Sequence, residues 1–344
     1  MNSLWRSTAI VGICTLLYMP AAMAIDTGKI ITHGFVDTEF EKSNHDTLGD
    51  PNGSFDQVHF NLLTDYAVSD TMTAKLHLEF EHSPITEDGF GNVALEWSYL
   101  EYIVNNNIRM RVGKDLTPFG VYNEIHDATP TYPFIRIPYG IYSTEKVGGS
   151  FDMVPHHSTG VYLLGNQYLK GDVNMNYVVY VANGENDAEN PAEVDENKNK
   201  TIGARFRITP IHDLTLGISY YKGQKGVAKI DHKTQGLSAE YTAYPFLARA
   251  EYVTSKLGTV DSKSAYAEAA YTVNRLTPFI RYNVLDPDDS IADDKWTEID
   301  AGIAYELQPN VVLKLEDRSV SGKPSNSVIN DDYNEIAAAV TVAF

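Results

Sequence analysis

The stretch that decides the fold is the last one, residues 335–344, which read EIAAAVTVAF. From Ile336 to Phe344 the large apolar side chains fall on one face, whereas Glu335 and Thr341 fall on the other, with small alanines between them. This period of two is the period of a β-strand that has one apolar and one polar face. The last ten residues therefore predict a strand that runs to the end of the chain.

The same alternation recurs along the chain after residue 24, in segments of about ten residues. Nothing after residue 24 approaches the ~20 consecutive apolar residues of a membrane-spanning helix. Sixteen segments are predicted: residues 29–42, 55–67, 72–83, 92–104, 107–116, 158–167, 172–184, 199–209, 213–223, 231–244, 246–256, 262–274, 277–286, 295–307, 310–320 and 332–344.

The connections between these segments alternate in length. Short ones hold turn residues, such as residues 105–107 and 309–310, whereas long ones are hydrophilic, such as residues 185–198 and 286–294. Short turns on one side and long loops on the other are typical of bacterial outer-membrane barrels. We therefore predict an all-β fold, a transmembrane antiparallel β-barrel, with sixteen strands favoured over eighteen.

A soluble β-sandwich or β-propeller is the competing architecture. Two features argue against it. The chain ends on a strand without a tail, and aromatic side chains gather near strand ends, as in the pairs Tyr220/Tyr221 and Tyr241/Tyr244, where a membrane barrel needs an interfacial girdle.

Composition excludes several other classes. The 344 residues carry a formal net charge of −19, with 27 Lys and Arg against 46 Asp and Glu. So acidic a chain predicts no nucleic-acid partner, because phosphate binding needs a basic surface. A hydrophobic content of 43% is too high for a disordered protein. The single cysteine, Cys14, excludes a disulfide framework and a cysteine-based zinc site.

Residues 1–24 predict a secretory signal peptide. Arg6 supplies a positive charge, residues 9–19 (AIVGICTLLYM) supply a short apolar stretch, and residues 22–24 (AMA) form a cleavage site. Cleavage would remove Cys14 and leave residues 25–344 as one barrel domain. The expected location is the cell outer membrane.

The longest interruption, residues 117–157, separates the fifth and sixth segments. A loop of this length is usually functional or disordered. Four prolines between residues 117 and 149, together with many aromatic residues, favour packing, because proline lowers the entropy cost of ordering and aromatics bring burial area. We predict that this third loop folds inward as a constriction loop. A packed external cap is the alternative.

Residues 113–123 (GKDLTPFGVYN) resemble the start of the third loop in Gram-negative porins, within the group related to the phosphate-selective O/P type. Residues 158–165 and 177–184 are similar to the next hairpin there, and the closing Phe344 resembles the C-terminal signal of outer-membrane barrel proteins. Outside residues 113–184 only the strand pattern is shared. Phosphate selectivity is not implied, because a dense ladder of lysine and arginine is missing.

The resemblance implies a homotrimer that passes small hydrophilic solutes by passive diffusion, in contact with outer-membrane lipid and lipopolysaccharide. A substrate-specific channel for sugars or small carboxylates and other anions is the alternative. An outer-membrane hydrolase is a further alternative, which only His82 and Ser83 suggest.

Strand parity assigns polar side chains to the lumen, because charge on the lipid face costs ~2–4 kcal/mol near the midplane. The candidate pore-lining residues are Arg109, Arg111, Arg205, Arg207, Arg249 and Arg281 on the segments, with Glu124, Asp127 and Arg136 on the loop. We expect wall arginines to face loop carboxylates and create a transverse field. The alternative is that these charges only pair across strands.

No catalytic residue, cofactor or metal site is predicted. His-Glu-x-x-His, Gly-x-Ser-x-Gly and phosphate-loop motifs are missing from the sequence. His33, His59 and His77 share lumen parity and so form a potential cluster. His156 and His157 are adjacent, and on a strand they would point to opposite faces. The acidic stretches 185–196 and 286–294 are expected to be solvated external loops, with divalent cations bridging them to lipopolysaccharide as the alternative.

Overall fold

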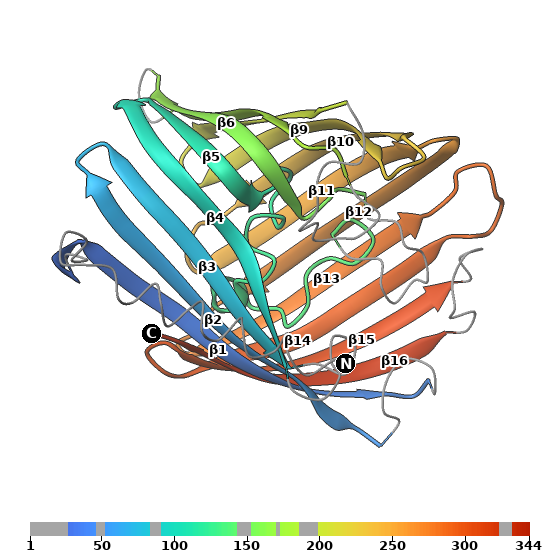
Figure 1. Cartoon of the computed structure of the whole chain (residues 1–344). Coiled ribbons are helices and arrows are strands. Elements are labelled where there is room, and N and C mark those ends of the chain that lie inside the picture. The colour runs from blue at the N-terminus through green and yellow to red at the C-terminus, as the bar shows by residue number, and fades with distance from the viewer. Residues whose placement is uncertain are drawn as a thin grey trace, which may run out of the picture.

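The computed structural model describes residues 27–45, 52–82, 91–142, 153–169, 173–185, 199–322 and 332–344. Sixteen antiparallel strands form a closed barrel, in which each strand pairs with its neighbours in sequence and β1 pairs with β16 (Figure 1). The strands are β1 (Ile30–Ser43), β2 (Ser54–Ser69), β3 (Met72–His82), β4 (Asn92–Asn105), β5 (Ile108–Leu116), β6 (His157–Tyr168), β7 (Asn174–Ala182), β8 (Thr201–Ile211), β9 (Leu214–Lys225), β10 (Ile230–Tyr241), β11 (Phe246–Leu257), β12 (Val260–Tyr271), β13 (Leu276–Asp286), β14 (Trp296–Gln308), β15 (Val311–Gly322) and β16 (Tyr333–Ala343).

Every predicted segment corresponds to one of these strands, and the boundaries differ by at most three residues. The sixteen-strand barrel is therefore confirmed, and the sandwich and propeller are excluded by the pairing of β1 with β16. Two short 3₁₀ helices, η2 (Thr27–Lys29) and η3 (Thr129–Thr131), accompany the strands. Among the described residues, no helix has the length and apolar character needed to cross a membrane. The predicted signal peptide lies outside the described residues.

The seam between the first and last strands closes the barrel. Gly34 and Phe344 exchange two backbone hydrogen bonds of 2.9 Å, and the pairing continues to Ser43 and Glu335. A Cβ atom on Gly34 would lie 2.8 Å from the Phe344 ring, so a glycine permits this close approach. Closure removes the sheet edges, whose unpaired backbone groups would be costly in lipid.

The two faces of each strand differ as the alternation predicts. In β14, Glu298 and Asp300 are fully buried inside the barrel, whereas Ile299 between them is 47% exposed on the outside. The described strands repeat this inversion of the usual soluble pattern, with exposed Leu, Ile and Val outside and charged groups inside. An apolar outer band around a polar interior is the pattern of a transmembrane barrel.

The described part of the long loop, residues 117–142 and 153–156, lies inside the barrel rather than outside as a cap (Figure 1). Its aromatic side chains pack with inward residues of the wall, such as Phe134 against Phe279 with ring centroids 4.4 Å apart. Asn123 ties the two ends of the loop together, because its side-chain amide donates to the carbonyl oxygens of Thr117 at 2.7 Å and His156 at 3.3 Å.

Candidate functional site

The first arm of the loop is held against β9 and β11. The backbone N–H of Gly120 donates to Ser219 Oγ at 3.0 Å, and that of Val121 donates to Glu251 Oε1 at 3.0 Å. Glu251 also accepts a 2.6 Å hydrogen bond from the hydroxyl of Tyr142, which lies farther along the loop. Gly120 has a φ of +56°, and a Cβ atom there would lie 2.0 Å from the Tyr142 hydroxyl. A glycine is therefore required at this contact.

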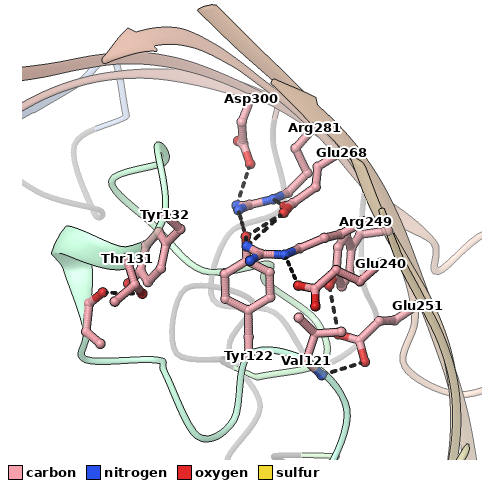
Figure 2. Close-up of polar contacts among 12 residues, drawn as sticks. Val121, Tyr122, Thr131, Tyr132, Glu240, Arg249, Glu251, Glu268, Arg281 and Asp300 are labelled. Atoms are coloured by element: carbon pink, nitrogen blue, oxygen red, sulfur yellow. Dashed lines mark hydrogen bonds and ion pairs between the residues drawn. The ribbon is translucent and has the colours of Figure 1, made fainter. Parts of the chain in front are cut away.

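Tyr122 forms the central contact between the loop and the wall (Figure 2). Its hydroxyl donates to Glu268 Oε1 at 2.5 Å and accepts from Arg249 Nη1 at 3.1 Å and from Arg281 Nη2 at 3.4 Å. Both guanidinium groups also lie over its ring, 5.1 and 5.6 Å from the centroid. Arg281 further contacts Glu268 at 2.8 Å and Asp300 at 3.3 Å, so cation and carboxylates compensate one another in a buried site.

The second arm of the loop is held by β15 and β1. The backbone N–H of Ile135 donates to Glu316 Oε2 at 2.7 Å. Arg136 of the loop pairs with Glu39 at 2.9 Å and with Glu41. The Lys314 ammonium donates to three loop carbonyl oxygens, at 2.6 to 2.9 Å: those of Thr129, Tyr132 and Phe134.

Charged side chains on β4 and β5 are less covered than those under the loop. Arg109 is 51% exposed and lies 3.5 Å from Glu101, whereas Arg111 is 19% exposed and pairs with Glu101 at 2.8 Å. Arg111 also pairs with Asp115 at 2.9 Å and lies over the Tyr99 ring at 4.7 Å. Arg109 is therefore the candidate arginine best placed to meet solutes in the lumen.

The loop does not fill the barrel. A cavity of about 600 Å³ lies between loop residues 130–133 and the short connections of the later strands. Pro245, Asn274 and Asn310 of those connections line it. The loop therefore leaves open space inside the barrel beside residues 130–133.

The amino-acid sequence matches known proteins along most of its length. A family model described as Gram-negative porin matches residues 16–323. The chain belongs to this porin family. A further match is short: 92 residues are 32% identical to a protein of Aquifex aeolicus (strain VF5) described as uncharacterized, which covers 26% of the porin and 21% of that protein.

Solved structures share the fold of this porin at low sequence identity. The Salmonella typhi OmpF complex with daunomycin has a TM-score of 0.64 at 13% identity, covering 94% of this chain and 100% of that one. The anion-selective porin from Comamonas acidovorans has 0.65 at 14%, covering 92% and 99%. The outer-membrane channel DcaP of Acinetobacter baumannii has 0.63 at 13%, covering 92% and 97%. Family and fold together place the porin in the outer membrane.

One predicted contact between wall arginine and loop carboxylate is present in the porin. Arg205 pairs with Glu124 and also donates to the carbonyl oxygen of Gly120 at 3.3 Å. Arg207 instead pairs with a wall carboxylate, Glu240, at 2.9 Å, and is 25% exposed. The structure therefore combines the two arrangements weighed from the sequence, because some lumen charges meet the loop and others pair across strands.

Two of the predicted pore-lining arginines are buried under the loop. The Arg281 side chain is 0% exposed and that of Arg249 is 9% exposed. Strand parity places both inside the barrel correctly, but Tyr122 and its neighbours cover this part of the wall. At Arg136 the expected arrangement of wall arginine and loop carboxylate is reversed, because here a loop arginine pairs with wall carboxylates. These three arginines anchor the loop rather than line an open lumen.

The predicted cluster of His33, His59 and His77 is not formed. His33 is exposed, and His59 lies 3.4 Å from Asp37. His77 donates to Asn61 Oδ1 at 2.6 Å. Lumen parity alone does not bring these three imidazoles together. His33 and His77 both pair with Leu63 and so lie two strands apart, whereas His59 lies four residues away from Leu63 along β2.

A different histidine cluster is present where the loop meets β4 and β6. His126 lies with its ring centroid 4.5 Å from that of His156 and 6.0 Å from that of His157. The sequence argument that separated His156 from His157 is wrong, because β6 begins at His157 and His156 still belongs to the loop. Asp127 contacts His126 here, instead of lining the pore opposite an arginine.

The loop groups in this cluster have shifted pKa values. Burial alone would lower the pKa of His126, but the Asp127 carboxylate, 3.0 Å away, outweighs burial and raises the pKa to about 9. Burial opposes ionisation of Asp127 as well, yet His126 holds the pKa of that carboxyl below its usual range. Burial and the nearby His126 lower the pKa of His156 to about 3. His126 and Asp127 thus form an ion pair beside neutral His156.

Proposed function

We propose that this porin forms a water-filled outer-membrane channel through which small hydrophilic solutes and ions diffuse passively. The observation that carries the proposal is a polar barrel interior crossed by a loop that is anchored on β9, β11, β12, β13, β15 and β1. Such a loop narrows the lumen at a fixed place, and the charges beside it set which solutes pass.

Planar-bilayer recording tests this function. Addition of the purified full chain is expected to give stepwise, ohmic current increases that heat-denatured protein does not give. A panel of sugars and small carboxylates then separates the two channel types: current without saturable block supports the general porin, whereas saturable block by one solute class supports the substrate-specific alternative. Absence of current from correctly folded protein would contradict both.

Charge at Arg109 is expected to influence ion selectivity. Replacing Arg109 with glutamate changes a half-exposed lumen charge beside Glu101, so the ratio of cation to anion permeability should rise by about twofold. The reversal potential in a KCl gradient measures the ratio. Lys256→Glu is the matched control, because it makes the same charge change at an exposed site where Lys256 pairs with Asp261. Equal shifts of the reversal potential in the two variants would show that the net charge of the protein, and not the position of Arg109, sets the ion selectivity.

The assembly and maturation of the porin are also part of this proposal. We propose a homotrimer in contact with outer-membrane lipid and lipopolysaccharide, exported by a signal peptide that is removed after Ala24. Heat-modifiable migration at three times the monomer mass would support the trimer, and N-terminal sequencing should begin at Ile25. A relation to the phosphate-selective O/P group rests on residues 113–123 and remains a prediction.

No catalytic activity is proposed. The hydrolase reading depended on His82 and Ser83, and Ser83 lies outside the described residues. Family and fold are those of a channel.

A further inference from the structure

Glu96 is placed at the loop by an irregularity in β4. The pairing of β3 with β4 shifts between His77 and Leu78, whose partners are Trp97 and Leu95, so Glu96 is the extra residue of a β-bulge. Bulges re-aim a side chain and are frequent beside functional sites. Here the bulge turns Glu96, which is 5% exposed, towards the loop residues His126 and Asp127.

Three ligand atoms converge at this point. One atom each of Glu96, His126 and Asp127 lies within 4.8 Å of the others, and two of these residues belong to the loop while one belongs to the wall. Together they offer one imidazole nitrogen and two carboxylates. A borderline divalent cation such as Zn²⁺ takes this combination of nitrogen and oxygen ligands at ~2.0–2.2 Å. In a tetrahedral complex those atoms lie about 3.3–3.6 Å apart, so a modest rotation of the side chains brings the three atoms to coordination distances.

The orientation of His126 is fixed by a backbone contact. Its Nδ1 lies 2.8 Å from the carbonyl oxygen of Asn123, so Nδ1 carries a proton and donates. Nε2 therefore faces Asp127 Oδ2, 3.0 Å away, and a bound cation would replace the proton between these two atoms. Metal-bound histidines share this arrangement, in which the second ring nitrogen donates to a carbonyl or carboxylate.

His157 orients the wall ligand in the same way. Its Nε2 lies 2.8 Å from Glu96 Oε2, and a carboxylate contacted by an imidazole N–H is a common outer shell around a metal. Nδ1 of this buried ring has no hydrogen-bond partner among the described residues. The cluster thus contains a buried, unsatisfied ring nitrogen in addition to its three convergent ligand atoms.

We propose that Glu96, His126 and Asp127 bind a divalent cation of the Zn²⁺ class, with water as a fourth ligand and with His157 as a positioning residue. The bound ion joins the constriction loop to β4 and adds positive charge inside the barrel. Binding itself is independent of the proposed channel function, whereas the effect on current rests on it.

Isothermal titration of the refolded full chain with ZnCl₂ tests the site. One equivalent should bind with a dissociation constant in the micromolar range, and millimolar Mg²⁺ should not compete, because Mg²⁺ prefers an all-oxygen octahedral site. Glu96→Gln and His126→Gln should each weaken binding by roughly tenfold or more. His157→Gln keeps all three ligands and should weaken binding less than either.

His212→Ala is the matched control. His212 and Asp213 form the same His-Asp dipeptide, with Nδ1 and Oδ2 2.6 Å apart, but the His212 side chain is 83% exposed on the turn between β8 and β9. Zn²⁺ affinity should therefore be unchanged in this variant. Co²⁺ supplies a second readout, because a four-coordinate N/O site gives visible absorption bands that His126→Gln should abolish and His212→Ala should retain.

The proposal is overturned if the wild-type chain binds no Zn²⁺, or if the Glu96 and His126 variants bind it as tightly as the His212 variant. In bilayers, micromolar Zn²⁺ should change the current of the wild type and of His212→Ala, but not that of Glu96→Gln. Zn²⁺ binding by a chain that gives no current would leave the site intact and contradict the channel function instead.

Discussion

Replacing Arg281 with alanine is expected to free the loop from the wall and to raise single-channel conductance several-fold. The guanidinium group is fully buried, lies 3.8 Å from the centroid of the Phe134 ring, and donates to the carbonyl oxygen of Arg136 at 2.8 Å. Its removal leaves Glu268 and Asp300 buried with one cation each instead of two, Arg249 at 3.6 Å and Arg318 at 3.3 Å. Breaking a buried pair in this way costs about 3–5 kcal/mol, and release of the loop relieves the cost by admitting water.

Single-channel recording in symmetrical KCl measures the conductance, and thermal unfolding followed by circular dichroism measures the stability. Lys256→Ala is the control, because Lys256 is an exposed cation near the end of β11 that pairs with Asp261 at 2.6 Å and makes no hydrogen bond or ion pair with the described residues of the loop. It should behave as the wild type. Wild-type conductance together with wild-type stability in Arg281→Ala would show that this contact does not hold the constriction.

Replacing Val340 with proline is expected to abolish barrel formation. Val340 lies in the middle of β16, paired with Thr38 on one side and Leu313 on the other, so its amide lies within the sheet at the closing seam. Proline removes that amide and disrupts a strand that has neighbours on both sides. In lipid, a backbone group left without a partner costs several kcal/mol.

Refolding into detergent, followed by migration of unheated and heated samples on a gel, reports barrel formation. Val340→Ala is the matched control, because it retains the amide and trims only a side chain on the lipid-facing surface, where Val340 is 44% exposed. The alanine variant should show the heat-dependent shift and the proline variant should not. A normal shift in the proline variant would mean that this part of the seam tolerates a missing hydrogen bond.

The barrel was predictable because each strand carries its own signal. Alternation within β14 or β16 is local, so the sequence places every inward carboxylate, such as Glu298 and Asp300, without reference to distant residues. The barrel followed from the alternation of short turns and long loops, and the structure closes it by pairing β1 with β16. Even the inward folding of the loop followed from its own content of proline and aromatic residues.

The roles of the charged residues were less predictable. Strand parity correctly assigned Arg249 and Arg281 to the inside of the barrel. Which part of the wall the loop covers, however, depends on contacts between residues far apart in sequence. Tyr122 and Glu268 are separated by 146 positions, and Ile135 and Glu316 by 181. No local pattern encodes such pairs. The loop tyrosine followed by asparagine, Tyr122-Asn123, was visible in the sequence but gave no indication of its partners.

The histidine cluster was missed for a related reason. Glu96 reaches the loop because a bulge displaces it, and a bulge does not interrupt the alternation strongly enough to be recognised in a single sequence. The pair His126-Asp127, followed by the adjacent His156 and His157 at the far end of the loop, was the signal that was available. Of these residues only Asp127 was predicted to belong to a site. His156 was treated as part of a strand, whereas β6 begins at His157 and His156 lies in the loop.

The positions of the loop anchors have a consequence for the order of assembly. The loop follows β5, but Lys314, Glu316 and Arg281 lie on β13 and β15, near the end of the chain. Until those strands have joined the sheet, the second arm of the loop lacks its contacts with β13 and β15 and can bind only β1. We therefore expect the constriction to be completed late, and a barrel that lacks β13 and β15 to lack these loop anchors. We therefore expect the porin to reach its final permeability at the stage at which the barrel closes.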